Sequence, residues 1–138
     1  MTKSSAYLGH LDEKTGRAQL LRDHLTGVAD LAGRFAAAFG EEEMGRLLGL
    51  YHDVGKYSRE FQAYIRADEA EKKKRRGSVD HSTAGAQEIA KLRQGAAAPL
   101  AFCIAGHHAG IPNRGERADP EGSATLLGRL KRKGLPDY

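Results

Sequence analysis

Residues 47–65 have the sequence LLGLYHDVGKYSREFQAYI, and their apolar pattern indicates a helical fold class. Apolar residues in and before it recur at spacings of three and four, which predicts an amphipathic helix from about Glu41 to Gly55. Ser58 is a good N-cap for a short helix that follows. The inward-facing residues of the two helices are Met44, Leu47, Leu48, Tyr51 and Val54, then Phe61, Tyr64 and Ile65. The stretch therefore predicts two consecutive helices.

The same kind of spacing predicts helices over most of the remaining chain. The expected helices cover residues 20–39, 81–93, 99–108 and 124–133. Gly40 ends the first of these, Pro99 suits a first turn, and Ser123 is the expected N-cap of the last. Residues 66–80, RADEAEKKKRRGSVD, lose all periodicity and predict an exposed loop. No alternating strand pattern is present, so the predicted fold class is all-α.

The composition is that of one globular domain over residues 1–138, with 40% hydrophobic and 29% charged residues. Its single cysteine, Cys103, cannot form an intrachain disulfide and is interpreted as a small core residue. The first thirty residues show no apolar core typical of a signal peptide, and no run approaches the roughly 20 apolar residues typical of a membrane helix. We therefore expect no membrane association and a cytoplasmic location. The net charge of +4 suits a phosphate-bearing partner.

Five of the six histidines fall on or at the start of predicted helices. The candidate metal ligands are His24, His52, Asp53, His81, His107 and His108. Taken singly, each histidine is more often a core or cap residue, but residues 52–53 and 107–108 are adjacent pairs whose side chains diverge by about 100°. Such pairs can reach two neighbouring ions, and a carboxylate such as Asp53 can bridge them. The pattern therefore favours a dinuclear transition-metal centre.

Lys56 follows Asp53 by three residues and projects from the same side of the predicted helix. An ammonium group beside a metal cluster can bind a phosphate oxygen or stabilise charge on a leaving oxygen. The alternative is a surface lysine favoured by the helix dipole. With His52 and Asp53 beside it, we favour the catalytic role, and Asp53 and Lys56 are the predicted catalytic residues.

Four stretches of the chain occur in a recognisable order. They are DHLTGVADLA at 23–32, LLGLYHDVGKYSREFQAYI at 47–65, VDHSTAGA at 79–86 and AGHHAGIPN at 105–113. Together they resemble the HD nuclease domain of the type I CRISPR helicase-nuclease. YHDVGK alone is typical of the whole HD superfamily, and GHHAGIPN after DHS narrows the resemblance. The resemblance implies an HD-domain helical bundle that hydrolyses phosphodiester bonds of single-stranded DNA.

The resemblance also implies how the ligands divide between two divalent transition metal ions. One ion would be held by His24, His52 and Asp53, and the other by Asp53, His81, His107 and His108. Lys56 matches the lysine of the family motif. The metals implied are manganese, iron, nickel or cobalt.

One element of the family pattern is missing from the sequence. Family members close the first metal site with an Asp on a later helix, whereas this sequence ends at GLPDY. Asp119 and Asp137 lie among loop residues, and neither is assigned. We therefore expect the N-terminal part of a longer domain that lacks the family's last helices, with a weakened first site and a better retained second site.

Two other functions stay open on sequence alone. A nucleotide phosphohydrolase of the HD superfamily would need a closed mononucleotide pocket and usually one metal, which the His-His pair disfavours. A non-catalytic module that docks a helicase or surveillance complex would bind no metal, and its basic segments at 72–76 and 129–133 are otherwise typical of solvated surface. The partners implied by the resemblance are single-stranded DNA, a CRISPR helicase domain or subunit, and a crRNA-guided surveillance complex.

Overall fold

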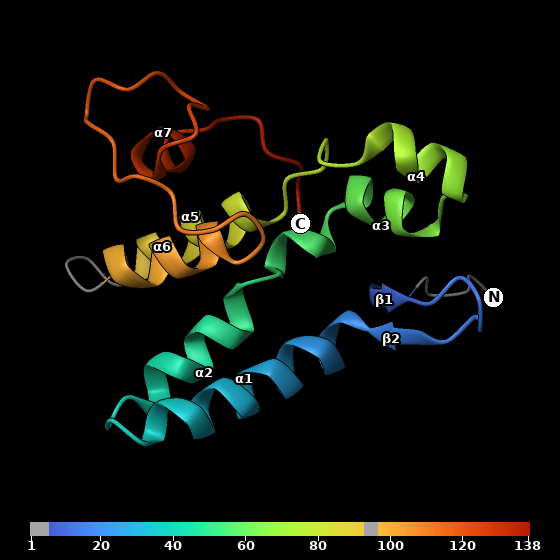
Figure 1. Cartoon of the computed structure of the whole chain (residues 1–138), viewed down its shortest axis with the longest axis horizontal. Helices are drawn as coiled ribbons and strands as arrows, with labels where there is room; N and C mark the ends of the chain where they lie inside the picture. Colours follow the sequence, from blue (N-terminus) through green and yellow to red (C-terminus); the bar gives the residue numbers. More distant parts are fainter. Residues whose placement is uncertain (1–5, 93–96) are drawn as a thin grey trace.

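The computed structural model describes residues 6–92 and 97–138, and these residues are mainly helical (Figure 1). In chain order the elements are β1 (Leu8–Leu11), β2 (Ala18–Leu20), α1 (Leu21–Ala37), α2 (Glu42–Tyr51), the 3₁₀ helix η1 (Val54–Tyr57), α3 (Arg59–Arg66), α4 (Glu69–Arg75), α5 (Ser82–Leu92), α6 (Ala97–Gly106) and α7 (Leu126–Leu130). The predicted helical bundle is confirmed. The expected helix end at residue 93 lies outside the described residues.

Helices α1 and α2 form a pair that packs through small residues, at the bottom of Figure 1. Gly45 faces the main chain of Ala32, and Gly49 faces that of Ala29. A Cβ at either glycine would overlap these backbone atoms, so only glycine permits this approach. The close contact holds His52, three residues after Gly49, against α1.

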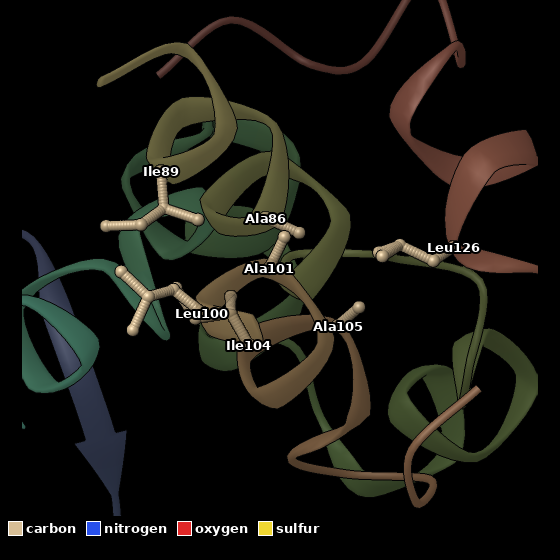
Figure 2. Close-up of a cluster of buried hydrophobic side chains, with 7 residues drawn as sticks. All are labelled: Ala86, Ile89, Leu100, Ala101, Ile104, Ala105 and Leu126. Carbon is tan, nitrogen blue, oxygen red and sulfur yellow. The ribbon is translucent and has the colours of Figure 1, made fainter. Parts of the chain in front are cut away.

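A second pair, α5 and α6, carries the main apolar core, with α7 lying against it (Figure 2). The buried side chains of this core are Ala86, Ile89, Leu100, Ala101, Ile104, Ala105 and Leu126. Burial of each large side chain of this kind contributes roughly 1.5–3 kcal/mol. The core fixes the start of α5 relative to the end of α6, where His81 and His107 lie.

The two helix pairs meet where α2 gives way to η1. The predicted helix to Gly55 is wrong in its last turn, because α2 ends at Tyr51 and residues 54–57 form a 3₁₀ helix. Gly55 packs so closely on the main chain of His81 that a Cβ there would overlap it, and Gly85 of α5 lies equally close to the Tyr51 carbonyl. Helix α2 therefore does not continue to Gly55, because η1 packs instead against the start of α5.

Residues 66–80, predicted to be an exposed loop, contain helix α4. This helix begins after Asp68, whose side chain accepts a hydrogen bond from the Glu71 amide at 2.8 Å. Acidic residues in its first turn and basic residues in its last turn complement the helix dipole. The helix buries none of its side chains, so it has no apolar periodicity from which it could have been predicted.

The hairpin of β1 and β2 was also not expected, because strands of four and three residues are too short to show alternation. Its first strand is bonded to α3 through Gln62. The side-chain amide of Gln62 accepts from Leu8 N and donates to Leu8 O, both at 2.9 Å. This attachment places Gly9 and His10 beside the start of α1.

Part of the apolar face predicted for residues 20–39 is not buried. Leu31, Phe35 and Phe39 are 45%, 69% and 73% exposed. The buried residues of α1 are Leu21, Leu25, Ala29, Gly33 and Ala36. The side of α1 with the smaller residues packs against α2, which leaves the phenylalanines on the outside.

Two further predictions are corrected in α6 and α7. Cys103 is exposed, so its interpretation as a core residue is wrong. Helix α7 is shorter than the predicted 124–133, and Thr125 caps it in place of Ser123 by accepting from Gly128 N at 3.3 Å. Within residues 6–92 and 97–138, no helix is long and apolar enough to cross a membrane.

Candidate metal centre

The structure brings the six candidate ligands together where the two helix pairs meet. His24 lies on α1, His52 and Asp53 follow α2, His81 precedes α5, and His107 and His108 follow α6. Most of them lie just beyond helix ends rather than on helices as predicted, because the chain turns at these points. Asp53 lies at the centre, with its side chain only 4% exposed.

One carboxylate oxygen of Asp53, Oδ2, faces α1. His24 Nε2 lies 2.9 Å and His52 Nε2 3.2 Å from this oxygen, and the two ring nitrogens are 3.2 Å apart. These donor atoms lie within 4.8 Å of one another. Ligand atoms bound tetrahedrally at about 2.1 Å from an ion are separated by roughly 3.4 Å, so the spacing fits one cation. His24, His52 and Asp53 are named the first set.

The other oxygen of Asp53, Oδ1, faces α5 and α6. His81 Nε2 and His107 Nε2 each lie 3.2 Å from it, and His108 Nε2 lies at 4.0 Å. The Nε2 atoms of His81 and His108 are 2.8 Å apart. These four residues, named the second set, also have donor atoms within 4.8 Å of one another. Asp53 therefore belongs to both sets and offers a different oxygen to each.

Hydrogen bonds behind two of the rings determine which nitrogen faces the carboxylate. His52 Nδ1 lies 2.7 Å from Gly49 O, and His107 Nδ1 lies 2.7 Å from Ile104 O. A carbonyl oxygen only accepts, so each Nδ1 carries a proton, and in the neutral form of the ring the lone pair of Nε2 then faces Asp53. A lone pair and a carboxylate oxygen 3.2 Å apart repel each other unless a cation lies between them. The donor atoms therefore fit divalent transition metal ions.

The electrostatics of the cluster favour the protonation states that bind metal. Burial alone would raise the pKa of Asp53, but its contacts with the imidazoles of His107, His52 and His81 and the charge of Lys56 lower it far below its ordinary value. Burial lowers the pKa of His24, and burial together with His107 lowers the pKa of His108. A charged carboxylate and a neutral imidazole are the forms that coordinate a divalent ion.

Lys56 is buried beside Asp53. Its Nζ lies 2.8 Å from Asp53 Oδ2, 3.3 Å from Gly9 O and 5.4 Å from the centre of the Phe61 ring. With its side chain only 7% exposed, Lys56 is not the surface lysine of the alternative interpretation. Its ammonium partly neutralises the buried carboxylate and holds a positive charge next to the cluster.

Arg129 of α7 connects the two segments that carry the second set. Its guanidinium donates to Ser82 Oγ at 2.7 Å and to Ala105 O at 2.6 Å. Ser82 follows His81 directly, and Ala105 lies two residues before His107. Sequence reasoning missed Arg129, because a run of basic residues such as 129–133 is typical of solvated surface.

Asp80, which directly precedes His81, also connects this segment to α7 and the residues after it through Arg129 and Arg132. Its carboxylate accepts from Thr83 N at 3.0 Å and so caps α5, and it lies 3.1 Å from an Arg132 nitrogen. Burial opposes ionisation, but the hydrogen bonds from Thr83 and the charges of Arg129 and Arg132 lower the pKa of Asp80 below its ordinary value. The position of Asp80 just before His81 in VDHS is the signal that could have identified it.

His10 and Asp119 lie outside both sets. His10 packs edge to face on His24, with 4.7 Å between ring centroids, and burial together with Lys56 lowers the pKa of His10. Asp119 accepts from Thr125 Oγ1 at 2.6 Å within its own loop. His10 is therefore a neighbour of the first set, and Asp119 serves its own loop.

Comparisons with known proteins indicate the same superfamily as the adjacent residues His52 and Asp53 in YHDVGK. The sequence model of the family described as "Cas3, HD domain" matches residues 9–133. The chain is also 46% identical over 50 residues to ribonuclease Y of Acholeplasma laidlawii (strain PG-8A). That similarity covers 36% of this chain and only 10% of ribonuclease Y. Since the family match spans most of the chain and includes every residue of both donor sets, the chain belongs to the Cas3 HD domain family, within the HD superfamily of metal-dependent phosphohydrolases.

Proposed function

We propose that this chain is a metal-dependent nuclease that hydrolyses phosphodiester bonds of single-stranded DNA in type I CRISPR interference. The observation that carries the proposal is the sharing of Asp53 between two donor sets, one on each carboxylate oxygen. Paired ions held in this way are typical of enzymes that cleave phosphodiesters. The proposed partners are a CRISPR helicase domain or subunit and a crRNA-guided surveillance complex, and the proposed location is the cytoplasm.

In this proposal the first set holds one divalent ion and the second set holds the other. Bound manganese, iron, nickel or cobalt would supply Lewis-acid stabilisation of phosphate oxygens and lower the pKa of the attacking water. The carbonyls behind His52 and His107 keep both rings in the orientation that faces Asp53. Lys56 holds a positive charge beside Asp53, which favours the negative charge that develops on the phosphate.

The exposure of the ligands indicates the side from which substrate reaches them. The side chain of His108, in the second set, is 56% exposed, whereas the side chains of the other five ligands in both sets are between 4% and 21% exposed. Substrate phosphate would therefore approach from the second set, and the first set would lie behind Asp53.

Metal analysis and DNA cleavage on the same samples test the proposal. Protein loaded with manganese, nickel or cobalt is expected to hold two ions per chain when both sets are filled and to cut circular single-stranded DNA. Asp53→Asn removes the shared charge, and it is expected to reduce metal content and to lower cleavage by about 100-fold or more. The matched control is Asp30→Asn, an exposed carboxylate paired with Arg46 at 2.6 Å, which is expected to leave both unchanged.

Asp53→Asn could fail to fold, because it leaves the charge of Lys56 buried without a partner. His108→Ala changes an exposed ligand instead, and it is expected to lower cleavage without lowering the melting temperature.

Each contrary outcome has a definite meaning. Cleavage that persists in EDTA or in folded Asp53→Asn protein would overturn the proposal. Hydrolysis of free deoxynucleotides without strand cleavage would favour the nucleotide phosphohydrolase. Protein that binds a helicase subunit but no metal would favour the docking module.

A further inference from the structure

A cavity of about 410 Å³ opens beside the second set. Its walls come from α3, the end of α4, residues 77–82 and Arg132, and they include His81 and His108. The proposed metal chemistry uses these two histidines and assigns no role to the rest of the cavity. A volume in this range accommodates a small organic group.

Two aromatic rings of α3 line the cavity, and they extend outward from the metal cluster. Phe61 is 6% exposed and packs edge to face on His81, with 5.1 Å between ring centroids. The ring centroids of Tyr64 and Phe61 lie 5.9 Å apart, and Tyr64 is only partly buried. Phe61 therefore supports the ring of His81, while Tyr64 offers accessible aromatic surface to a ligand. Unstacked nucleobases bind to surface of this kind.

Two arginines line the same cavity, but only one has a carboxylate partner. Arg132 lies 3.1 Å from Asp80. Arg75, the last residue of α4, is half-buried and forms no ion pair with any residue in 6–92 or 97–138. Arg75 thus offers an uncompensated guanidinium, which binds phosphate oxygens well.

We propose that this cavity binds the nucleotide next to the scissile phosphate of a single DNA strand, with its base against Tyr64 and its outer phosphate at Arg75. The inference rests on the proposed nuclease function and adds a subsite to it. A base inside a duplex is stacked on its neighbours and cannot lie against Tyr64, so the subsite selects single strands. Its contacts go to the face of a base and to a phosphate, which carry little sequence information.

Binding to metal-free protein tests the subsite separately from catalysis. In EDTA, the fluorescence anisotropy of a labelled oligothymidylate reports its affinity for the full chain without hydrolysis. Tyr64→Ala and Arg75→Ala are each expected to weaken binding about tenfold. Tyr64→Phe keeps the ring and is expected to bind within about twofold of the wild type.

The matched control for charge is Arg34→Ala, in the last turn of α1 and outside the cavity. It removes the same positive charge from the protein and is expected to weaken binding by no more than about twofold. Circular dichroism of every variant shows whether it is folded. Because Arg75 is the last residue of α4, Arg75→Ala keeps the test decisive even if Tyr64→Ala is unstable.

The inference is overturned if folded Tyr64→Ala and Arg75→Ala bind the oligonucleotide as well as Arg34→Ala does. Thymidine monophosphate binding as tightly as the oligonucleotide would also overturn it, since the cavity would then serve free nucleotides. Tighter binding of oligouridylate would overturn the assignment to DNA. Cleavage by manganese-loaded wild-type protein is measured in parallel, so a failure of the nuclease proposal is recognised separately from a failure of the subsite.

Discussion

The two donor sets share Asp53 but are assembled in different ways. The first set comes from α1 and the turn after α2, a helix pair in close contact through Gly45 and Gly49, and it is nearly closed to solvent. The second set comes from three separate segments connected by Arg129, and it ends in the exposed His108. In the proposed metal centre, one bridging carboxylate thus joins an enclosed donor set to a set that reaches the surface at His108.

The sets also differ in their number of donors. The first set has three, and its Asp53 oxygen is shared with Lys56, whereas the second set has four. We therefore expect the second set to bind a divalent ion more tightly than the first.

Loss of a single ligand is expected to have the largest effect on this difference. His81→Ala should weaken metal binding by the second set more than about 100-fold, because ligand loss exceeds the effect of losing a supporting hydrogen bond. His24→Ala should weaken only the first set and leave one ion bound. Calorimetric titration with manganese or cobalt measures both affinities. Loss of both ions in His24→Ala would show that the two sets do not bind independently.

The next effect tests how closely η1 approaches the second set. Gly55→Ala is expected to reduce the free energy of unfolding by about 2–3 kcal/mol, because the added Cβ would overlap the main chain of His81. At Gly27 of α1, by contrast, an added Cβ meets no atom within 4 Å. Gly27→Ala should therefore raise the free energy of unfolding by about 0.5–1 kcal/mol. Denaturant unfolding measures the free energy of unfolding of both variants. Equal changes in Gly55→Ala and Gly27→Ala would contradict the close packing of Gly55 on the main chain of His81.

A smaller effect is expected from removing the connection behind the second set. Arg129→Met should lower the metal affinity of the second set about tenfold and leave the first set unchanged. The control is Arg34→Met, an arginine of α1 that contacts neither set. The same calorimetric titration reports the result. An equal loss in both sets would mean that Arg129 stabilises the whole domain rather than His81 and His107.

The smallest effect concerns acid stability at the start of α5. The pKa of Asp80 is lowered below 3.8 in the folded protein, so the unfolded state takes up this proton first as pH falls. The contribution of Asp80 is therefore complete above about pH 3.8 and is lost as pH falls through the lowered pKa. Asp80→Asn should lower the free energy of unfolding near neutral pH by about 1 kcal/mol. Below pH 3.8, the free energy of unfolding of Asp80→Asn should then fall less than that of the wild type.

Unfolding of Asp80→Asn and of the wild type is measured near neutral pH and well below pH 3.8, where the contribution of Asp80 is lost. Asp30→Asn, which breaks an exposed ion pair, should change stability by about 0.5 kcal/mol or less at either pH. A stability difference between Asp80→Asn and wild type that is the same at both pH values would contradict a lowered pKa.

The sequence determined which residue types are available for the centre and that the chain is helical. The pair His52-Asp53 and the pair His107-His108 are local patterns, and so is the periodicity of residues 20–39 and 41–55. Local patterns of this kind depend on neighbours three or four residues away, which the sequence displays directly. The ligand roles themselves stay predictions until metal binding is measured.

The arrangement of these residues in space depends on tertiary contacts. The turn at Asp53, the burial of Lys56 and the contacts of Arg129 all depend on segments far apart in the chain. Phe35 is apolar yet 69% exposed, because glycine and alanine permit a closer contact between α1 and α2 than a phenylalanine would. Hydrophobic periodicity identifies a face that can be buried, but the fit between main chains and side chains selects the face that is buried.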